Sequence, residues 1–112
     1  MKGGRELAQE SVLRAAETLF HPLRYKIVEA LRTDPKGLYI NELADLMKAD
    51  RQLVSFHLLT LASGGYVQGE YKIAKKPASK GKAVKVYRLT AKVEEAFKAI
   101  RKELDPKSKP TS

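Results

Sequence analysis

The stretch LVSFHLLTLASGGYV, from Leu53 to Val67, decides the fold of this 112-residue chain. Within it, apolar residues recur at the spacing i, i+4, i+7 of one helix face, which predicts a helix from Arg51 to about Ser63. Asp50 is an N-cap residue for its start. Gly64-Gly65 ends it, because glycine adopts a left-handed backbone without a Cβ clash. The side of this helix that is expected to face the core carries Val54, Leu58 and Leu61.

A second, shorter helix precedes this one across a tight turn. Asn41 is placed to cap a helix from Glu42 to Lys48, and about two turns fit before the next cap. Only Ala49 separates that helix from Asp50. Two short helices joined by so tight a turn form a helix-turn-helix and not a long hairpin.

The elements around this pair complete the fold prediction. Helical periodicity predicts two helices upstream, and Pro22 suits the first turn of the second one. Apolar residues predict two strands downstream with a lysine-rich turn between them, and Thr90 is placed to cap a last helix. The predicted ranges are helices 6–20, 22–33, 42–48, 51–63 and 91–104, strands 38–40, 66–73 and 84–89, and a turn at 75–82. The expected fold class is therefore mainly α with a small β-hairpin, a winged helix-turn-helix in the order α-α-β-α-α-β-β-α.

The charge distribution indicates a polyanionic partner. Basic residues outnumber acidic ones by 22 to 13, a net charge of +9. Seven basic residues lie between Lys72 and Arg88 with no acidic residue among them, and without these seven only 15 remain against 13 acidic ones. A nearly neutral body with one cationic projection is typical of a polyanion contact. The alternative is a solvated lysine-rich loop.

Several other function classes are excluded by what the sequence lacks. There is no cysteine, which excludes disulfides, thiolate metal sites and thiol nucleophiles. No glycine-rich phosphate loop, histidine-activated nucleophile or set of convergent carboxylates is present, so neither an enzyme nor a cofactor is expected. His21 is expected to be a helix-junction residue. The amino terminus lacks the apolar core of a signal peptide, and no run approaches the roughly 20 residues of a membrane span, so a cytoplasmic protein is expected.

The chain resembles the ArsR-like winged-helix transcriptional repressors over about residues 12 to 100. The matching stretches are LFHPLRYKIVEAL at 19–31, INELADLM at 40–47, LVSFHLLTLASGGYV at 53–67 and YRLT at 87–90. The resemblance implies a regulator that binds double-stranded DNA as a homodimer, paired through its first and last helices. Many of these repressors sense metals through cysteines of the third helix or through carboxylate and histidine ligands of the last helix. This chain has neither set, and two distant histidines cannot supply the roughly four ligands of zinc, so no metal is expected.

The helix at 51–63 carries the residues expected to read DNA bases. Its N-terminal outward side would reach base edges in the major groove. Arg51 could pair with guanine, Gln52 with adenine, and Phe56 could contact a thymine methyl group, with Ser55 beside them. For Arg51 and Gln52 the alternative is a solvated first turn, and for Phe56 it is completion of the core.

Two further sets of residues are expected to contact the DNA backbone and a second subunit. His57 falls on the family's histidine position and is interpreted as a hydrogen-bonded packing residue or a phosphate donor. The residues expected at the DNA backbone are His57, Lys72, Lys75, Lys76, Lys80, Lys82 and Lys85. The residues expected at the dimer interface are Leu7, Val12, Leu19, Val93, Phe97, Ile100 and Leu104. The alternative for the second set is that both apolar stripes are buried in their own core.

The sequence therefore predicts a sequence-specific transcriptional regulator, a repressor that binds a near-palindromic DNA site as a homodimer. Residues 1–104 would form its DNA-binding domain, with terminal helices for dimerisation, and the polar residues 105–112 a flexible tail. The resembled family usually has polar residues at Leu53 and Leu59, which could instead cover the base of the hairpin or a partner protein. One alternative is thus a protein-interaction module with Leu53, Phe56 and Leu59 as its contact patch. Another is a sequence-independent nucleic-acid-binding protein.

Overall fold

The computed structural model describes residues 2–73 and 83–105, with side chains from residue 10 onward. The elements follow one another in the predicted order, which confirms the fold class. In chain order they are α1 (Lys2–Leu19), α2 (Pro22–Arg32), β1 (Leu38–Tyr39), α3 (Ile40–Met47), α4 (Arg51–Ser63), β2 (Val67–Ile73), β3 (Ala83–Leu89) and α5 (Ala91–Leu104). The predicted turn at 75–82 lies outside the described residues.

Both predicted ends of α4 are confirmed, whereas α1 begins at Lys2 and not at the predicted Glu6. The Asp50 carboxylate accepts from the Gln52 N–H at 3.0 Å, and Gly65 takes a left-handed backbone with φ +83° just beyond α4. The cap predicted at Asn41 is wrong, because α3 begins at Ile40 with Tyr39 as its N-cap. The reason is that the Glu42 carboxylate reaches back to accept from the Tyr39 N–H at 2.9 Å.

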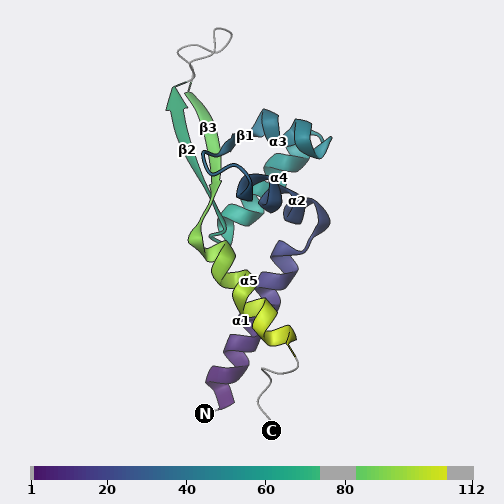
Figure 1. Cartoon of the computed structure of the whole chain (residues 1–112), viewed down its shortest axis with the longest axis vertical. Coiled ribbons are helices and arrows are strands. Elements are labelled where there is room, and N and C mark those ends of the chain that lie inside the picture. The colour runs from purple at the N-terminus through teal and green to yellow at the C-terminus, as the bar shows by residue number, and fades with distance from the viewer. Residues whose placement is uncertain (1, 74–82, 106–112) are drawn as a thin grey trace.

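The three strands form one antiparallel sheet in the order β1-β3-β2. Leu38 of β1 lies opposite Tyr87 of β3, and Val67 of β2 lies opposite Leu89 at the base of the hairpin. The hairpin of β2 and β3 lies beside the helices at one end of the molecule (Figure 1). β3 contacts α2 and α3, and Val86 at its middle is buried, so this half of the hairpin is tied to the core.

The hydrophobic core forms where the helices meet the base of the sheet. Burial of these side chains is the main force that holds the elements together. Its largest fully buried side chains are Leu19, Ile27, Val28, Leu43, Val54, Leu58, Leu61 and Val93. They come from all five helices, so the helix-turn-helix and the terminal helices share one core.

The terminal helices α1 and α5 lie side by side and form a two-helix arm at the end of the molecule opposite the hairpin (Figure 1). The molecule is accordingly elongated, at 62 × 25 × 21 Å. Over the described ranges, none of the helices combines the length and apolar character needed to cross a membrane. The arm is thin, and much of its surface lies away from the shared core.

A set of contacts, which we call the clasp, joins the end of α4 to the start of α5. The Lys92 Nζ donates to the Gly64 carbonyl at 2.6 Å and lies 5.0 Å from the centre of the Tyr66 ring. The Thr90 hydroxyl donates to the Gly65 carbonyl at 2.6 Å, and it also accepts from the Lys92 N–H at 3.3 Å as the N-cap of α5. These bonds satisfy carbonyls at the α4 end, which would otherwise lack partners.

Candidate nucleic-acid interface

The turn between α3 and α4 fixes the start of α4. Lys48 ends α3 in a left-handed conformation with φ +53°. The Ala49 N–H then donates back to the Ala44 carbonyl at 3.1 Å, and Asp50 caps the next helix. Only Lys48, Ala49 and Asp50 separate the two helices, as the sequence predicts for a helix-turn-helix.

One side of α4 is buried and the other is open. The helix packs against α2, α3, β2 and α1. Its buried residues are Val54, His57, Leu58 and Leu61. This confirms the stripe predicted from the i, i+4, i+7 spacing and adds His57 to it.

All four residues predicted to read bases lie on the open side of α4. Arg51, Gln52, Ser55 and Phe56 are exposed, and the Phe56 side chain is 61% exposed. The alternative in which Phe56 completes the core is therefore wrong. The described residues leave this side of the helix uncovered, so its side chains are accessible to a partner.

Leu53 and Leu59 also remain exposed, at 46% and 67%. Both leucines therefore keep apolar surface that a partner could cover. Together with Phe56 they make the outer side of α4 unusually apolar for a surface that is flanked by charged residues.

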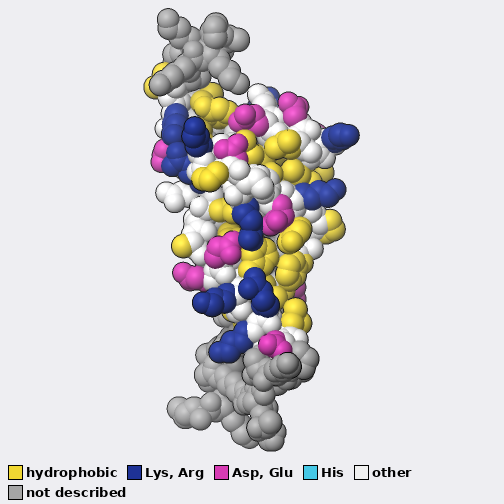
Figure 2. Space-filling model, in the orientation of Figure 1, with side chains coloured by type: hydrophobic (Ala, Val, Ile, Leu, Met, Phe, Trp, Pro, Cys, Tyr) yellow, Lys and Arg dark blue, Asp and Glu magenta, His cyan; other side chains and the backbone are white. Residues whose placement is uncertain are grey.

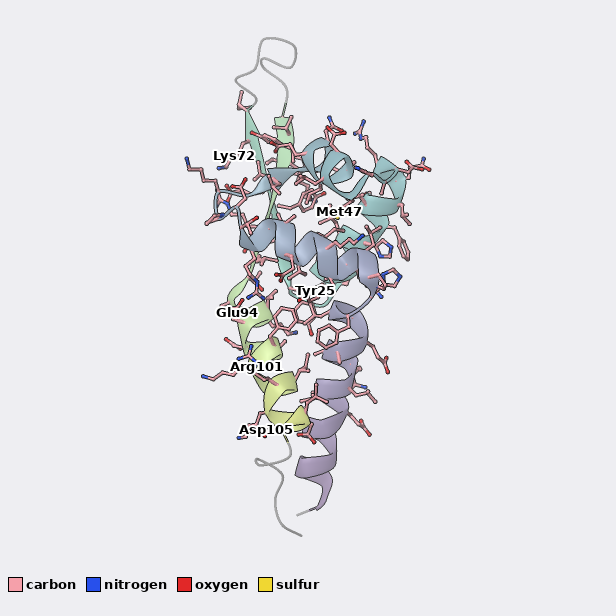
Figure 3. All side chains as sticks on the ribbon, turned by 45° about the vertical axis from the view of Figure 1, so that its right-hand side comes forward. Tyr25, Met47, Lys72, Glu94, Arg101 and Asp105 are labelled. Atoms are coloured by element: carbon pink, nitrogen blue, oxygen red, sulfur yellow. The ribbon has the colours of Figure 1, made fainter. Side chains whose placement is uncertain are left out.

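The described part of the hairpin carries two of the predicted backbone-contact lysines. The Lys85 ammonium lies 5.4 Å from the centre of the Tyr71 ring and 5.6 Å from that of Tyr87, so cation–π attraction holds it against the sheet. Lys72 is 3.9 Å from the Glu70 carboxylate, which reduces its effective charge (Figure 3). The other predicted wing lysines, Lys75, Lys76, Lys80 and Lys82, lie outside the described residues.

Solved structures share this arrangement of a helix-turn-helix beside a hairpin. The transcriptional repressor BigR from Xylella fastidiosa matches with a TM-score of 0.69 and 23% identity, over 99% of this chain and 100% of that chain. A possible transcriptional regulator for arsenical resistance matches with a TM-score of 0.60 and 23% identity, over 86% and 85%. The chain has the winged helix-turn-helix fold. Its hairpin is the wing.

A third winged-helix structure is similar in the same way. It is the homodimeric winged helix-turn-helix DNA-binding domain of Mb0332 from Mycobacterium bovis, a possible ArsR-family regulator, with a TM-score of 0.61 and 18% identity over 87% of this chain and 81% of that chain. No protein-family model and no curated protein matches the sequence. The likeness to ArsR-like regulators is thus shown at the level of the fold.

His57 is a packing residue of the winged-helix core, which confirms one of its two interpretations and excludes the other, that of a phosphate donor. Its side chain is only 5% exposed, and its ring lies 4.6 Å from that of His21 and 5.3 Å from that of Phe56. Its Nδ1 has no hydrogen-bond partner among the described residues, so the expected hydrogen bond is not found. The signal was present in the sequence, because His57 lies three residues from Val54 on the buried face of the helix.

His21 has the junction role expected of it. Its Nδ1 accepts from the Leu23 N–H at 3.3 Å and so caps the start of α2.

Burial lowers the pKa of His57 below its usual value of 6.5, and the nearby His21 and Arg24 lower it further. No group of three or more metal-ligating side chains occurs in the described ranges.

The residues expected at the dimer interface are mostly buried within a single chain. Leu19 and Val93 are 0% exposed, so neither can reach a second subunit. Phe97 and Ile100 are also buried, and Val12 is half-buried against the core. Of the predicted set, only Leu104 is fully accessible, at 72% exposed, and the Leu7 side chain lies outside the described residues. For most of these residues the alternative of burial in their own core is correct.

A different set of apolar side chains lies open on the arm and beside it. Leu13 is 59% exposed and Phe20 47%. A pocket of about 320 Å³ lies between α2 and the arm, where the rings of Phe20, Tyr25 and Phe97 are 5.9 to 6.2 Å apart. Figure 2 shows hydrophobic side chains gathered over this part of the surface, and Figure 3 shows Tyr25 between α2 and the arm. This surface was missed because sequence periodicity does not show which of two adjacent apolar stripes is buried.

The lowered pKa of His57 predicts a pH-dependent stability. The unfolded chain binds a proton at His57 more readily than the folded chain, so the free energy of unfolding falls as the pH drops below about 6.5. We expect His57→Phe, which keeps a ring between His21 and Phe56, to reduce this dependence between about pH 5.5 and 7.5. Urea unfolding at a series of pH values measures the free energy of unfolding of both proteins. Equal pH dependence in both proteins, or an NMR titration that gives His57 a pKa of 6.5 or above, would contradict the prediction.

Proposed function

We propose that this protein is a sequence-specific, double-stranded-DNA-binding transcriptional regulator of the ArsR-like family, a repressor that acts as a homodimer in the cytoplasm. The observation that carries the proposal is the open outer side of α4, beside a basic hairpin on a winged-helix scaffold. In this fold a helix enters the major groove while the neighbouring wing contacts the flanking backbone. The role is one of binding and not of catalysis.

The first turns of α4 would provide the base contacts. The Arg51 guanidinium matches the O6 and N7 acceptors of guanine, and the Gln52 amide matches the donor and acceptor of adenine. Ser55 accepts and donates, and Phe56 offers an apolar surface. The Asp50 cap and the buried face of α4 hold these side chains outward without help from DNA.

The wing would supply charge and little sequence information. Lys72 and Lys85 are exposed on its strands, and the sequence adds Lys75, Lys76, Lys80 and Lys82 between them. Lysine contacts to phosphates position a protein on DNA without distinguishing bases. His57 is left out of this set because it is buried.

A homodimer would be formed through the arm, by the open apolar side chains and not by the stripe first expected. Exposed Leu13, Phe20 and Leu104 lie on the arm, with Tyr25 beside them. A thin two-helix arm with such side chains on its surface gains stability when a second copy covers them. The Mb0332 domain, which has this fold, is described as homodimeric. A dimer on a near-palindromic promoter site would block polymerase sterically.

A second candidate function is favoured by one observation. Leu53, Phe56 and Leu59 are all exposed on α4, and such an apolar patch is also typical of a protein-interaction surface. A winged-helix interaction module would bind duplex DNA weakly or not at all at low salt. A sequence-independent nucleic-acid-binding protein would bind without preference.

Selection from random duplexes at physiological salt, read by sequencing, tests the proposal. We expect a near-palindromic site with half-site centres about 34 Å or a multiple of that apart. Arg51→Ala and Gln52→Ala should each relax the preference at particular base pairs by about 1 to 3 kcal/mol, because they remove base contacts. Ser11→Ala on the arm is the control and should select the wild-type site. Recovery of no preferred sequence would contradict the proposal.

The wing predicts a steep salt dependence. If the dimer contacts about 6 to 10 phosphates, affinity should fall by about 10³ to 10⁵ between 50 and 200 mM salt. Replacing Lys75, Lys76, Lys80 and Lys82 by Ala should reduce the slope of log K on log salt and weaken all sequences alike. Lys98→Ala, an exposed lysine of the arm, serves as the control. An unchanged slope in the wing variant removes the wing from the DNA contact.

The arm predicts the position of the dimer interface. Leu13→Glu should raise the dimer dissociation constant more than about tenfold, because burying an unpaired carboxylate is costly. Leu46→Glu is a matched control, since Leu46 is 60% exposed on α3 and Leu13 is 59% exposed on α1. Sedimentation equilibrium measures the dimer dissociation constant of both variants. A monomeric wild type, or a Leu13 variant that associates as the wild type does, shows that the interface lies elsewhere.

A further inference from the structure

The outermost ridge of α4 is apolar at its centre. Gln52, Phe56, Leu59 and Ser63 follow the spacing i, i+4, i+7, i+11, which places them on one helix face. This face lies opposite the one that carries Val54, Leu58 and Leu61. All four members are exposed. The two central members, Phe56 and Leu59, are the most prominent apolar side chains of the helix, at 61% and 67% exposed.

The Phe56 side chain packs against a neighbouring ring. Its ring meets that of His57 edge-on, at 5.3 Å and 72°, and the His57 ring in turn lies 4.6 Å from that of His21. Because His57 is buried, the exposed Phe56 ring packs against a ring of the core. An aromatic side chain held this way loses little conformational freedom when a ligand covers it.

The major groove of DNA offers one apolar group to such a ridge. Base edges there present hydrogen-bond donors and acceptors, and the C5-methyl group of thymine is the exception. Polar base edges would gain nothing from contact with Phe56 or Leu59, and they would lose water. A ridge that is apolar at its centre therefore complements methyl groups.

We propose that Phe56 and Leu59 read the C5-methyl groups of thymine, so that each half-site of the target contains thymines at neighbouring base pairs. The proposal rests on the DNA-binding function proposed above and names the chemistry that its site selects. The two side chains are separated by about 4.5 Å along the helix axis, and base pairs are stacked about 3.4 Å apart. Gln52, one turn earlier on the same ridge, suits an adenine, which makes the half-site rich in A·T pairs.

Deoxyuridine in place of thymidine tests the proposal without changing the protein. The substitution removes only the methyl group and keeps every hydrogen-bonding atom of the base pair. In the duplex recovered by selection, we expect the affinity of the protein to fall about fourfold for each contacted thymidine that is replaced by deoxyuridine. 5-Bromodeoxyuridine, whose bromine fills the place of the methyl group, should restore the affinity.

Variants of the ridge assign the contacts. Each of the variants Phe56→Ala and Leu59→Ala should lose the discrimination between thymidine and deoxyuridine at one position of the site. The reason is that the side chain that contacts that methyl group has been removed. Leu46→Ala is the matched control, a leucine 60% exposed on α3 and outside the ridge, and it should keep the wild-type discrimination. Both ridge residues are exposed, so circular dichroism should show folded variants.

The outcomes separate this inference from the function on which it rests. Sequence-specific binding with equal affinity for thymidine and deoxyuridine duplexes overturns the methyl contact and leaves the regulator proposal standing. The apolar ridge would then belong to a contact with another protein. If no duplex binds even at low salt, the DNA-binding function itself fails. Discrimination that survives in both ridge variants also overturns the inference, because other residues must then contact the methyl groups.

Discussion

Val54, Leu58 and Leu61 are at most 1% exposed, and their burial fixes the rotation of α4 about its own axis. Fully burying one such side chain contributes about 1.5 to 3 kcal/mol, so turning the helix to bring another face inward would cost several times that amount. This burial therefore sets the orientation of the outer side of α4. The start of the helix is equally fixed, since the Asp50 cap allows no shift along the chain. The residues proposed to contact DNA bases depend on this orientation.

The row of rings formed by His21, His57 and Phe56 connects that core to the surface. His21 caps α2, His57 lies within the core, and Phe56 stands on the outer side of α4. A charge at His57 would therefore be felt at both a helix junction and the outer surface. In this place histidine packs like an aromatic residue while it keeps a titratable group within the fold.

Local patterns predicted most of the fold, and the errors concern one helix cap, the role of His57 and the apolar stripes of the terminal helices. The helix-turn-helix follows from Asp50, the buried stripe and the glycine pair, which are all local. Asn41 was wrongly assigned as a cap because the backward reach of Glu42 depends on the actual backbone. The exposure of Arg51, Gln52, Ser55 and Phe56 on the outer side of α4 was predicted correctly from periodicity. His57 lies on the buried stripe of α4, which agrees with its interpretation as a packing residue and not with that as a phosphate donor.

The arm shows the limit of such reasoning most clearly. Amphipathic stripes on α1 and α5 show that something covers them, and they do not show whether it is the same chain or a second copy. Leu19 and Val93 are fully buried by their own chain, whereas Leu13 on the neighbouring stripe of α1 stays open. Only the packing of the two helices distinguishes these cases.

The clasp has a mechanical consequence. Lys92 and Thr90 bind the carbonyls that end α4, so the helix that faces outward and the helix that forms half of the arm meet with no flexible linker between them. In a dimer joined at the arms, the angle at which the two arms cross would set the distance between the two α4 helices. A small rotation of one arm against the other would move the two α4 helices by a larger distance, because the molecule is elongated.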